Sequence, residues 1–166
     1  MANGCTEDTM PTAKTSKVNY IPTGYHTATP YLIARHAAKA IDWYKEVFGA
    51  VEEMRFPMPD GRVGHAEIKI GDSHIMLGDE FPEMHAVSPE TIGGTASAIM
   101  IYVPDVDRVF EKAVAMGAKV KEDLKDKFYG DRNATFYDPF GHQWTVGTHI
   151  EDVTPEEMRR RMSEQK

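Results

Sequence analysis

The sequence predicts an α+β fold made of one module that occurs twice: a strand, a helix and a hairpin. Two observations carry this prediction. First, an amphipathic helical pattern occurs at 36–50 and again at 105–118, each time after a strand-like run. Second, strand patterns with alternating polarity follow each helix. Two βαβββ modules of this kind are expected to form a cupped mixed sheet. The helices would lie on its outer side, and the inner face would be left to enclose a molecule.

The first module is predicted at about residues 25–80. It opens with the extended run TATPYLIA, in which Pro30 indicates a strand edge or a break. The stretch 36–50 predicts a helix, because its apolar residues recur every three or four positions and Gly49 can end it. In 62–70, polar and apolar residues alternate, which is typical of a half-buried strand, and a turn at 71–73 leads to a return strand.

The second module is predicted at about 96–150, after a linker at 81–95 that is rich in Pro and Gly. The strand ASAIMIYV and the helix DVDRVFEKAVAMGA repeat the plan of the first module. Residues 19–150 are therefore expected to form a single domain. Residues 1–18 are polar and predict a flexible arm, and 151–166 predict a C-terminal helix that Thr154 caps and Glu157 completes as a capping box.

The stretch NATFYDPFGHQWTV predicts a hairpin around a tight turn at 138–141. Because side chains alternate along a strand, Trp144 and Val146 are expected in the core. Gln143 and Thr145 would then face the inside of the cup.

Composition excludes several classes of function. The 166 residues carry a formal net charge of -7, which opposes nucleic acid and anionic membrane surfaces as partners. The single cysteine, Cys5, excludes an internal disulfide. No apolar run reaches the length of a membrane span, and the N-terminal stretch lacks the apolar centre of a signal peptide. A cytoplasmic protein is expected.

Three segments carry a family resemblance: GYHTATPYLIARHAAKAIDWYKEVFGA, DGRVGHAEIKIGDSHIMLGDE and FYGDRNATFYDPFGHQWTVGTHIEDVTPEEM. The chain resembles the vicinal oxygen chelate superfamily, which includes glyoxalase I, bleomycin-resistance proteins, fosfomycin-resistance enzymes and extradiol dioxygenases. Within it, the glyoxalase/bleomycin-resistance-like proteins of the PhnB-like branch are most similar. The resemblance implies paired βαβββ modules and a homodimer. It leaves the function open, because one fold hosts many chemistries.

The resemblance also tests for a metal site. Metal-dependent members present His and Glu ligands at four positions, which here hold Thr29, Met76, Ala98 and Thr145. None of these is a usual ligand of a hard or borderline divalent metal. The usual site is therefore expected to be absent and no cofactor is predicted, with a divalent metal at a displaced site as the alternative.

Alternation along the strands predicts which residues line the cup. Two candidates come from elsewhere: His26 precedes the first strand, and the FYGDR segment is expected as a loop at the cup's rim. There Tyr129 could stack on a ring, and Arg132 could pair either with an anionic ligand or with Asp131. The predicted ligand-binding residues are His26, Thr29, Tyr31, Met76, Ala98, Met100, Tyr102, Tyr129, Arg132, Gln143 and Thr145.

His65 and Glu67 are the catalytic candidates, because side chains at i and i+2 are neighbours on one strand face. A histidine beside a carboxylate can act as a general base near neutral pH, or the pair can form a structural hydrogen bond. Two functions follow. The first is metal-free binding of a small aromatic or hydrophobic molecule. The second is a glyoxalase-like lyase or isomerase, or a dioxygenase relative, that uses this pair, with or without a divalent metal. A cup filled by its own side chains is a third possibility.

Overall fold

The computed structural model describes residues 18–164, so nearly all of the predicted arm lies outside the described residues. The first module contains β1 (Tyr31–Ala34), α1 (Ala37–Phe48), β2 (Val51–Pro57), β3 (Val63–Ile70) and β4 (Ser73–Asp79). The second contains β5 (Ala98–Tyr102), α3 (Val106–Ala115), β6 (Lys119–Asp126), β7 (Asp131–Tyr137) and β8 (Gln143–His149). The predicted α+β fold of two βαβββ modules is confirmed.

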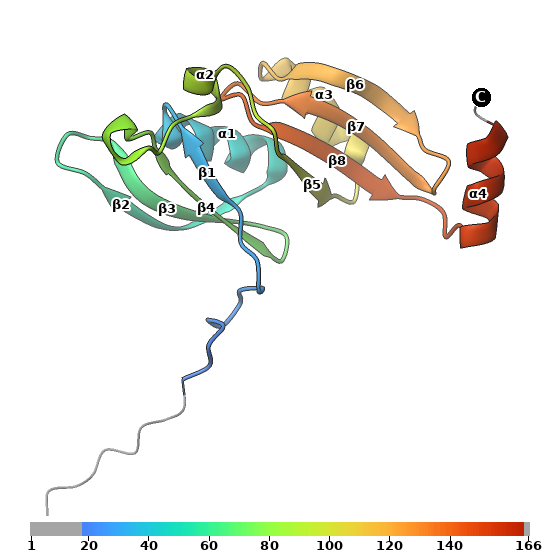
Figure 1. Cartoon of the computed structure of the whole chain (residues 1–166), viewed down its shortest axis with the longest axis horizontal. Coiled ribbons are helices and arrows are strands. Elements are labelled where there is room, and N and C mark those ends of the chain that lie inside the picture. Colours follow the sequence, from blue (N-terminus) through green and yellow to red (C-terminus); the bar gives the residue numbers. More distant parts are fainter. Residues whose placement is uncertain (1–17, 165–166) are drawn as a thin grey trace, which may run out of the picture.

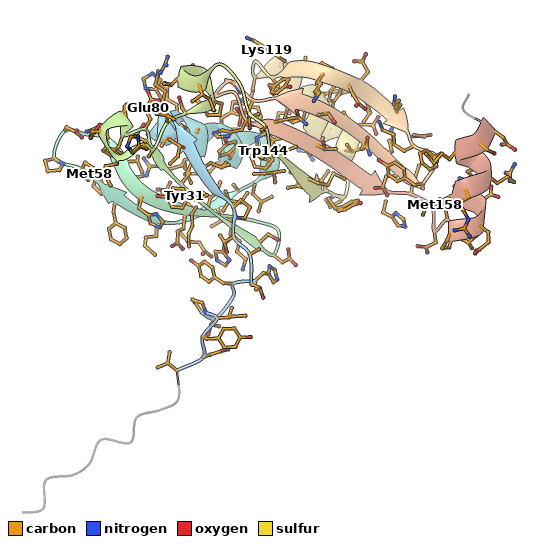
Figure 2. The ribbon with its side chains drawn as sticks, in the orientation of Figure 1. Tyr31, Met58, Glu80, Lys119, Trp144 and Met158 are labelled. Carbon is orange, nitrogen blue, oxygen red and sulfur yellow. The ribbon has the colours of Figure 1, made fainter. Side chains whose placement is uncertain are left out.

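Each module forms its own four-stranded mixed sheet, in the orders β1-β4-β3-β2 and β5-β8-β7-β6. The first pair in each order is parallel and the others are antiparallel. Figure 1 shows the two sheets side by side along the long axis, with α1 and α3 behind the strands. The opposite face of each sheet is called the inner face below. Figure 2 marks Tyr31 on β1 and Trp144 at the junction of the modules.

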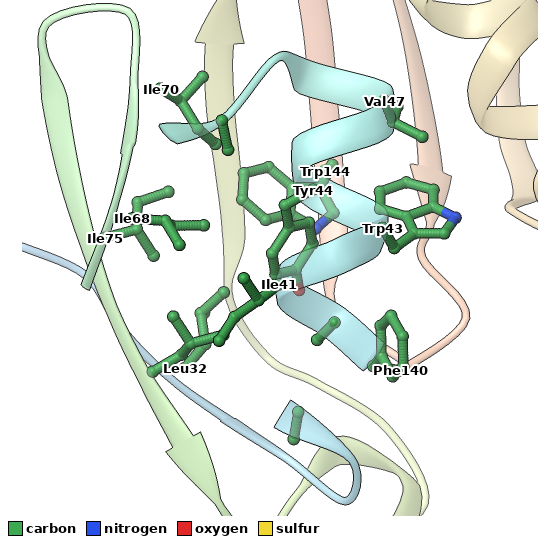
Figure 3. Close-up of a cluster of buried hydrophobic side chains, with 14 of the residues drawn as sticks. Leu32, Ile41, Trp43, Tyr44, Val47, Ile68, Ile70, Ile75, Phe140 and Trp144 are labelled. Atoms are coloured by element: carbon green, nitrogen blue, oxygen red, sulfur yellow. The ribbon is translucent and has the colours of Figure 1, made fainter. Parts of the chain in front are cut away.

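Helix α1 joins the two modules through a shared aromatic core (Figure 3). Its Ile41 is fully buried with Ile68 of the first sheet, whereas Tyr44 packs 5.3 Å from Trp144 of the second, measured between ring centroids. Gly49 ends the helix in the left-handed conformation, as predicted. Trp144 and Val146 are fully buried, which confirms their predicted core positions.

Asp138 holds this junction together from the turn between β7 and β8. Its Oδ2 accepts hydrogen bonds from the Tyr44 hydroxyl at 2.7 Å and the Trp144 indole at 2.8 Å. Its Oδ1 accepts from the backbone N–H groups of Phe140 and His142, both at 2.9 Å. Burial, followed by the charge of Asp138, holds the pKa of Tyr44 well above its usual value.

Some elements differ from the sequence expectations. Strand β1 begins only at Tyr31, because Pro30 has no N–H to donate to the sheet. The linker contains a 3₁₀ turn, η1 (Pro82–Met84), and a short helix, α2 (Pro89–Ile92), which Ser88 caps. The predicted rim loop is shorter than expected, because Asp131 and Arg132 already belong to β7.

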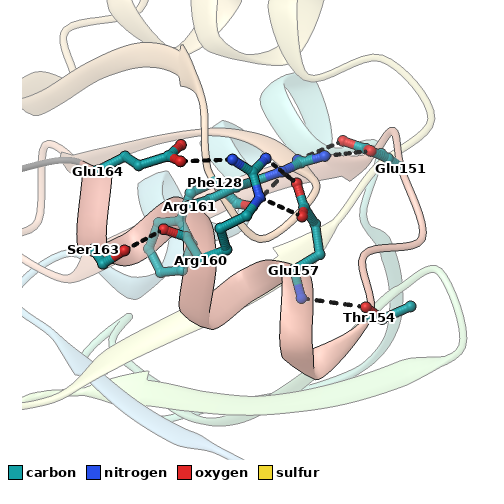
Figure 4. Close-up of polar contacts among 8 residues, drawn as sticks. All are labelled: Phe128, Glu151, Thr154, Glu157, Arg160, Arg161, Ser163 and Glu164. Carbon is teal, nitrogen blue, oxygen red and sulfur yellow. Dashed lines mark hydrogen bonds and ion pairs between the residues drawn. The ribbon is translucent and has the colours of Figure 1, made fainter.

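The C-terminal helix α4 (Pro155–Glu164) follows β8 at the far end of module two (Figure 1). Thr154 caps it by accepting from the Glu157 N–H at 3.3 Å. The Glu157 carboxylate accepts instead from Arg160 and Arg161, so the second half of the predicted capping box does not form (Figure 4). Within residues 18–164, no helix is long and apolar enough to span a membrane.

Candidate functional site

The inner face of the first sheet carries a row of polar and polarisable side chains. Across the strands, Glu67 lies opposite Met54 on one side and Met76 on the other, and Met76 lies opposite Tyr31. In the next row, His65 lies opposite Phe56. Alternation predicted that His65, Glu67, Met76 and Tyr31 share this face, and the strand register brings them together.

Three of these side chains, Glu67, His65 and Tyr31, form a continuous hydrogen-bonded chain with Tyr25. The Tyr25 hydroxyl donates to Glu67 Oε2, and Glu67 Oε1 lies 3.1 Å from His65 Nε2. On the other side of the imidazole, Nδ1 lies 3.1 Å from the Tyr31 hydroxyl. Because the carboxylate accepts, Nε2 carries a proton, and Nδ1 can then accept from Tyr31. The chain links an exposed phenol to a carboxylate that is 8% exposed.

Gly78 gives the Tyr31 hydroxyl room to reach His65. A Cβ at this position would lie 3.0 Å from the Gly64 carbonyl oxygen and 3.4 Å from the Tyr31 hydroxyl. Close packing on this face therefore favours glycine, since a Cβ there would push against backbone and the hydroxyl.

A cavity of about 410 Å³ lies beside Glu67, between the inner face and the segment that leads into β1. It brings together four predicted site residues: His26, Thr29, Glu67 and Met76. Its remaining lining residues are Tyr20, Ile21, Pro22, Tyr25 and Thr27. This cavity has one carboxylate among mainly apolar and aromatic walls, an arrangement typical of small-molecule pockets.

Tyr25 is the residue that the sequence analysis missed. It donates to Glu67 and stacks on the ring of His74 at a centroid distance of 4.0 Å. No periodic pattern identifies it, because it precedes the first strand. The fold brings Tyr25 to Glu67 on β3, although the two residues are 42 positions apart in the sequence.

The second module's predicted residues do not join this site. Thr145 bonds to Thr135 at 3.0 Å, and Gln143 accepts from Lys121 at 2.7 Å. Met100 and Tyr102 line a separate cavity at the junction of the modules. Ala98, Gln143 and Thr145 line neither that cavity nor the one beside Glu67.

The second module has its own polar cluster at the end of its sheet. The buried Asp131 accepts from the Tyr102 hydroxyl and from His149 Nδ1, both at 2.8 Å. The hydrogen bond to Asp131 raises the pKa of Tyr102, and the same carboxylate, with Asp152, raises the pKa of His149. These partners satisfy one another.

Arg132 and Tyr129 also have internal partners. The Arg132 guanidinium donates to Asp107 at 2.7 and 2.9 Å and to Asp126 at 2.9 Å. The alternative in which Arg132 pairs with Asp131 is wrong, because alternation along β7 directs adjacent side chains to opposite faces. Tyr129 accepts from the Asn133 amide at 2.7 Å.

The four positions where the family resemblance places metal ligands do not fit a divalent metal. They offer two hydroxyls, one thioether and no carboxylate or imidazole, whereas such metals bind charged oxygen and imidazole donors. Residues 18–164 also contain no group of three or more His, Cys, Asp or Glu side chains placed to hold a metal ion.

Comparison with protein families matches residues 25–146 to the Glyoxalase/Bleomycin resistance protein/Dioxygenase superfamily. The chain belongs to this superfamily. The family expected from the sequence is thus confirmed. Among similar proteins, the Mycobacterium tuberculosis protein Rv0887c is 40% identical over 140 residues, covering 82% of each chain. Mb0911c of Mycobacterium bovis is also 40% identical, over 82% of this chain and 92% of the relative.

Solved structures agree with this assignment. TioX from Micromonospora sp. ML1 is 29% identical, with a TM-score of 0.59, over 78% of this chain and 100% of TioX. PA1353 from Pseudomonas aeruginosa is 25% identical, with a TM-score of 0.62, over 75% and 98% of the chains. The fosfomycin resistance protein FosX from Listeria monocytogenes, solved with Mn(II) and sulfate, is 19% identical, with a TM-score of 0.58, over 82% and 97%, and shares the fold.

Proposed function

We propose that this superfamily member binds a small, mainly aromatic or hydrophobic molecule on the inner face of its first module. The observation that carries the proposal is the exposure of large apolar side chains around the buried Glu67. Tyr31 is 50% exposed and Phe56 58%, and Met54, which lies opposite Glu67 on β2, is 36% exposed. Aromatic and thioether surface that stays exposed next to a polar anchor favours a ligand site over a filled core.

Glu67 supplies the polar anchor. Both of its oxygens are engaged, by Tyr25 and His65, yet each carboxylate oxygen can accept a second hydrogen bond. A ligand that carries an N–H, an O–H or a cationic group would therefore gain a charge-assisted bond there. The net charge of -7 also favours cations over anions.

Several finer properties belong to the same proposal. Ligand binding would proceed without the metal ion and ligand residues that are usual in the family. The protein would be a cytoplasmic homodimer of the PhnB-like branch. Light scattering during size-exclusion chromatography tests the homodimer. Metal analysis of protein purified without chelator and then dialysed tests the metal: a stoichiometric divalent ion that is lost in Glu67→Ala would contradict metal-free binding.

A thermal-shift screen against aromatic and cationic small molecules tests the binding itself. Compounds that bind only the folded protein raise its apparent stability. The expected hits stabilise the wild type but stabilise Tyr31→Ala less, because that variant removes exposed aromatic surface. A screen in which no compound shifts the melting temperature would favour the self-filled cup.

The hydrogen-bonded chain from Tyr31 through His65 to Glu67 favours a second candidate, a lyase or isomerase that moves a proton. His65 Nδ1 would take a proton through Tyr31, and Glu67 would stabilise the imidazolium that results. If a turned-over substrate is found, kcat/KM should depend on pH in the wild type. Turnover that persists unchanged in His65→Gln would overturn this candidate.

A further inference from the structure

Tyr25 contacts the inner face of module one through both its ring and its hydroxyl. The hydroxyl donates to Glu67, and the ring stacks on that of His74, with a centroid distance of 4.0 Å and an angle of 11° between the planes. Glu67 and His74 lie on neighbouring strands, β3 and β4. Together they form a surface that holds one hydroxyphenyl group, with an acceptor for its hydroxyl and a flat ring against its aromatic face.

Both groups of this surface have partners other than Tyr25. Glu67 Oε1 lies 3.1 Å from His65 Nε2. His74 Nε2 lies 2.6 Å from Glu53 Oε2. The carboxylate and the imidazole are therefore expected to keep their places when Tyr25 leaves. A surface that is arranged in advance binds a ligand with less loss of conformational freedom.

Little else holds Tyr25 against the sheet. It belongs to the segment 18–28, in which no residue is buried, and which runs away from both sheets in Figure 1. Among the described residues, the one hydrogen bond from this segment to the rest of the protein is that of Tyr25 to Glu67. The bond from the Tyr25 N–H to the Pro22 carbonyl oxygen, at 3.1 Å, lies within the segment. A segment with so few contacts leaves the sheet at a low cost in free energy.

The cavity of about 410 Å³ beside Glu67 adjoins Tyr25, which is one of its lining residues. With Tyr25 in place, the Glu67 side chain is 8% exposed, so a molecule in the cavity reaches little of the carboxylate. When Tyr25 moves out, its place joins the cavity. Both the carboxylate and the face of the His74 ring are then open to a ligand.

We propose that Tyr25 is an internal occupant of this site, and that the ligand is a small phenol that displaces Tyr25 and takes over its two contacts. The hydroxyl of the ligand donates to Glu67, and its ring stacks on His74. This inference rests on the proposed function, because it names the ligand class of the same site. It also implies regulation: the ligand binds only those molecules whose segment 18–28 has moved away, so Tyr25 lowers the apparent affinity.

p-Cresol and toluene test the displacement, because p-cresol is the tyrosine side chain as a free molecule and toluene lacks only its hydroxyl. We would label the full chain with 3-fluorotyrosine, assign the ¹⁹F signal of Tyr25 by its absence from Tyr25→Phe, and titrate each probe. p-Cresol is expected to move the Tyr25 signal toward that of free 3-fluorotyrosine, and toluene to leave it in place. p-Cresol that does not bind, or that binds without moving this signal, would overturn the proposal.

Removal of the internal competitor should raise the affinity for the same probe. Tyr25→Ala is expected to bind p-cresol at least about tenfold more tightly than the wild type, because the site is then always open. Tyr25→Phe, which keeps the ring but cannot donate to Glu67, should show a smaller gain. Toluene should bind Tyr25→Ala at least about tenfold more weakly than p-cresol, because it makes no hydrogen bond to the carboxylate. Equal binding of the two probes would mean that the variant has an apolar hole that does not recognise a phenol.

Tyr102→Phe is the matched control, because Tyr102 also donates to a carboxylate, that of Asp131, but in module two. This variant should bind p-cresol as the wild type does. Equal affinities of the wild type and Tyr25→Ala, or an equal gain in Tyr102→Phe, would mean that Tyr25 anchors its segment without competing for the site.

This inference and the proposed function fail in different ways. Compounds that stabilise the wild type in the thermal-shift screen, when p-cresol does not bind, would refute the phenol and leave the site beside Glu67 in place. If neither the wild type nor Tyr25→Ala bound p-cresol or any screened compound, both would be refuted.

Discussion

The two modules share one frame and differ in the chemistry of its centre. In module one, Met76 lies opposite both Tyr31 and Glu67. In module two, Thr145 lies opposite both Met100 and Thr135. An acid held by a tyrosine and a histidine thus occupies the place where the other module has a pair of threonines.

This difference indicates that the inner faces of the two modules have different roles. The threonine hydroxyls of module two bond to each other, 3.0 Å apart, and leave no charge on the inner face at that position. Module one keeps an ionisable row and exposes aromatic surface around it. Trp144 and Asp138 of module two form the junction with Tyr44 of module one. The proposed ligand binding in module one and the contacts of Asp138 at the junction can therefore be separated by mutation.

The largest expected effect comes from Asp138→Ala at the junction. Four donors, including the hydroxyl of Tyr44 and the indole of Trp144, would lose their acceptor. A buried donor left unpaired costs about 1–3 kcal/mol, so we expect a loss of at least about 3 kcal/mol in the free energy of unfolding. Urea unfolding followed by tryptophan fluorescence measures it.

Asp126→Ala is the matched control, because Asp126 is an exposed carboxylate of the same module that pairs with Arg132. Its loss should cost about 1 kcal/mol or less, as for most surface ion pairs. If both variants lost the same stability, Asp138 would not be the structural link between the modules.

Ligand binding should respond to the centre of module one and not to that of module two. For a cationic or donor-bearing hit from the thermal-shift screen, Glu67→Gln is expected to weaken binding about tenfold or more, because a charge-assisted hydrogen bond is lost. Thr135→Val, at the corresponding position, should leave affinity unchanged. Isothermal titration calorimetry checks both. Equal losses would contradict the assignment of the site to module one.

Two glycines at corresponding positions test how tightly each inner face is packed. At Gly78 a Cβ would meet a backbone oxygen at 3.0 Å, whereas at Gly147 its nearest contact is the Met100 methyl, at 2.8 Å. The methionine end can move and the backbone cannot. Gly78→Ala should therefore cost about 1–3 kcal/mol and Gly147→Ala distinctly less. If Gly147→Ala lost more stability than Gly78→Ala in thermal unfolding, the Met100 side chain would be unable to move aside.

The repeat and the core could be predicted from the sequence, because burial makes apolar residues recur at a fixed spacing along helices and strands. Trp144 and Val146 alternate with Gln143 and Thr145, and the structure keeps that alternation. The same rule placed His65 beside Glu67 on one face. Family resemblance and periodicity led to the same fold.

The contacts of the site could not be predicted from periodicity. Tyr25 reaches Glu67 from an irregular segment, and no local pattern encodes a contact 42 residues away. The exposed strand β6, with the sequence KVKEDLKD, has no apolar alternation that would reveal it. Arg132 was expected in a loop beside the cup, but it lies in β7 and pairs with Asp107.

The smallest expected effect on stability comes from replacing two glutamates that follow corresponding strands, Glu80 after β4 and Glu151 after β8. Glu80 accepts from the hydroxyls of Thr91 and Ser88 and from the Ser88 N–H, with Arg35 beside it. These bonds, led by that from Thr91, lower the pKa of Glu80 from 4.5 to about 2. Glu151 has one partner, Arg161, and is exposed.

A carboxyl whose pKa is lowered by folding stabilises the protein above its unfolded pKa and loses that contribution as the pH falls. Glu80→Gln should therefore cost about 1 kcal/mol at pH 7. The gap to wild type should close between about pH 4.5 and 2. Glu151→Gln should show a smaller gap at every pH. Urea midpoints measured across this range check both variants. A gap for Glu80→Gln that stays constant down to pH 2 would mean that its hydrogen bonds, and not its charge, stabilise module one.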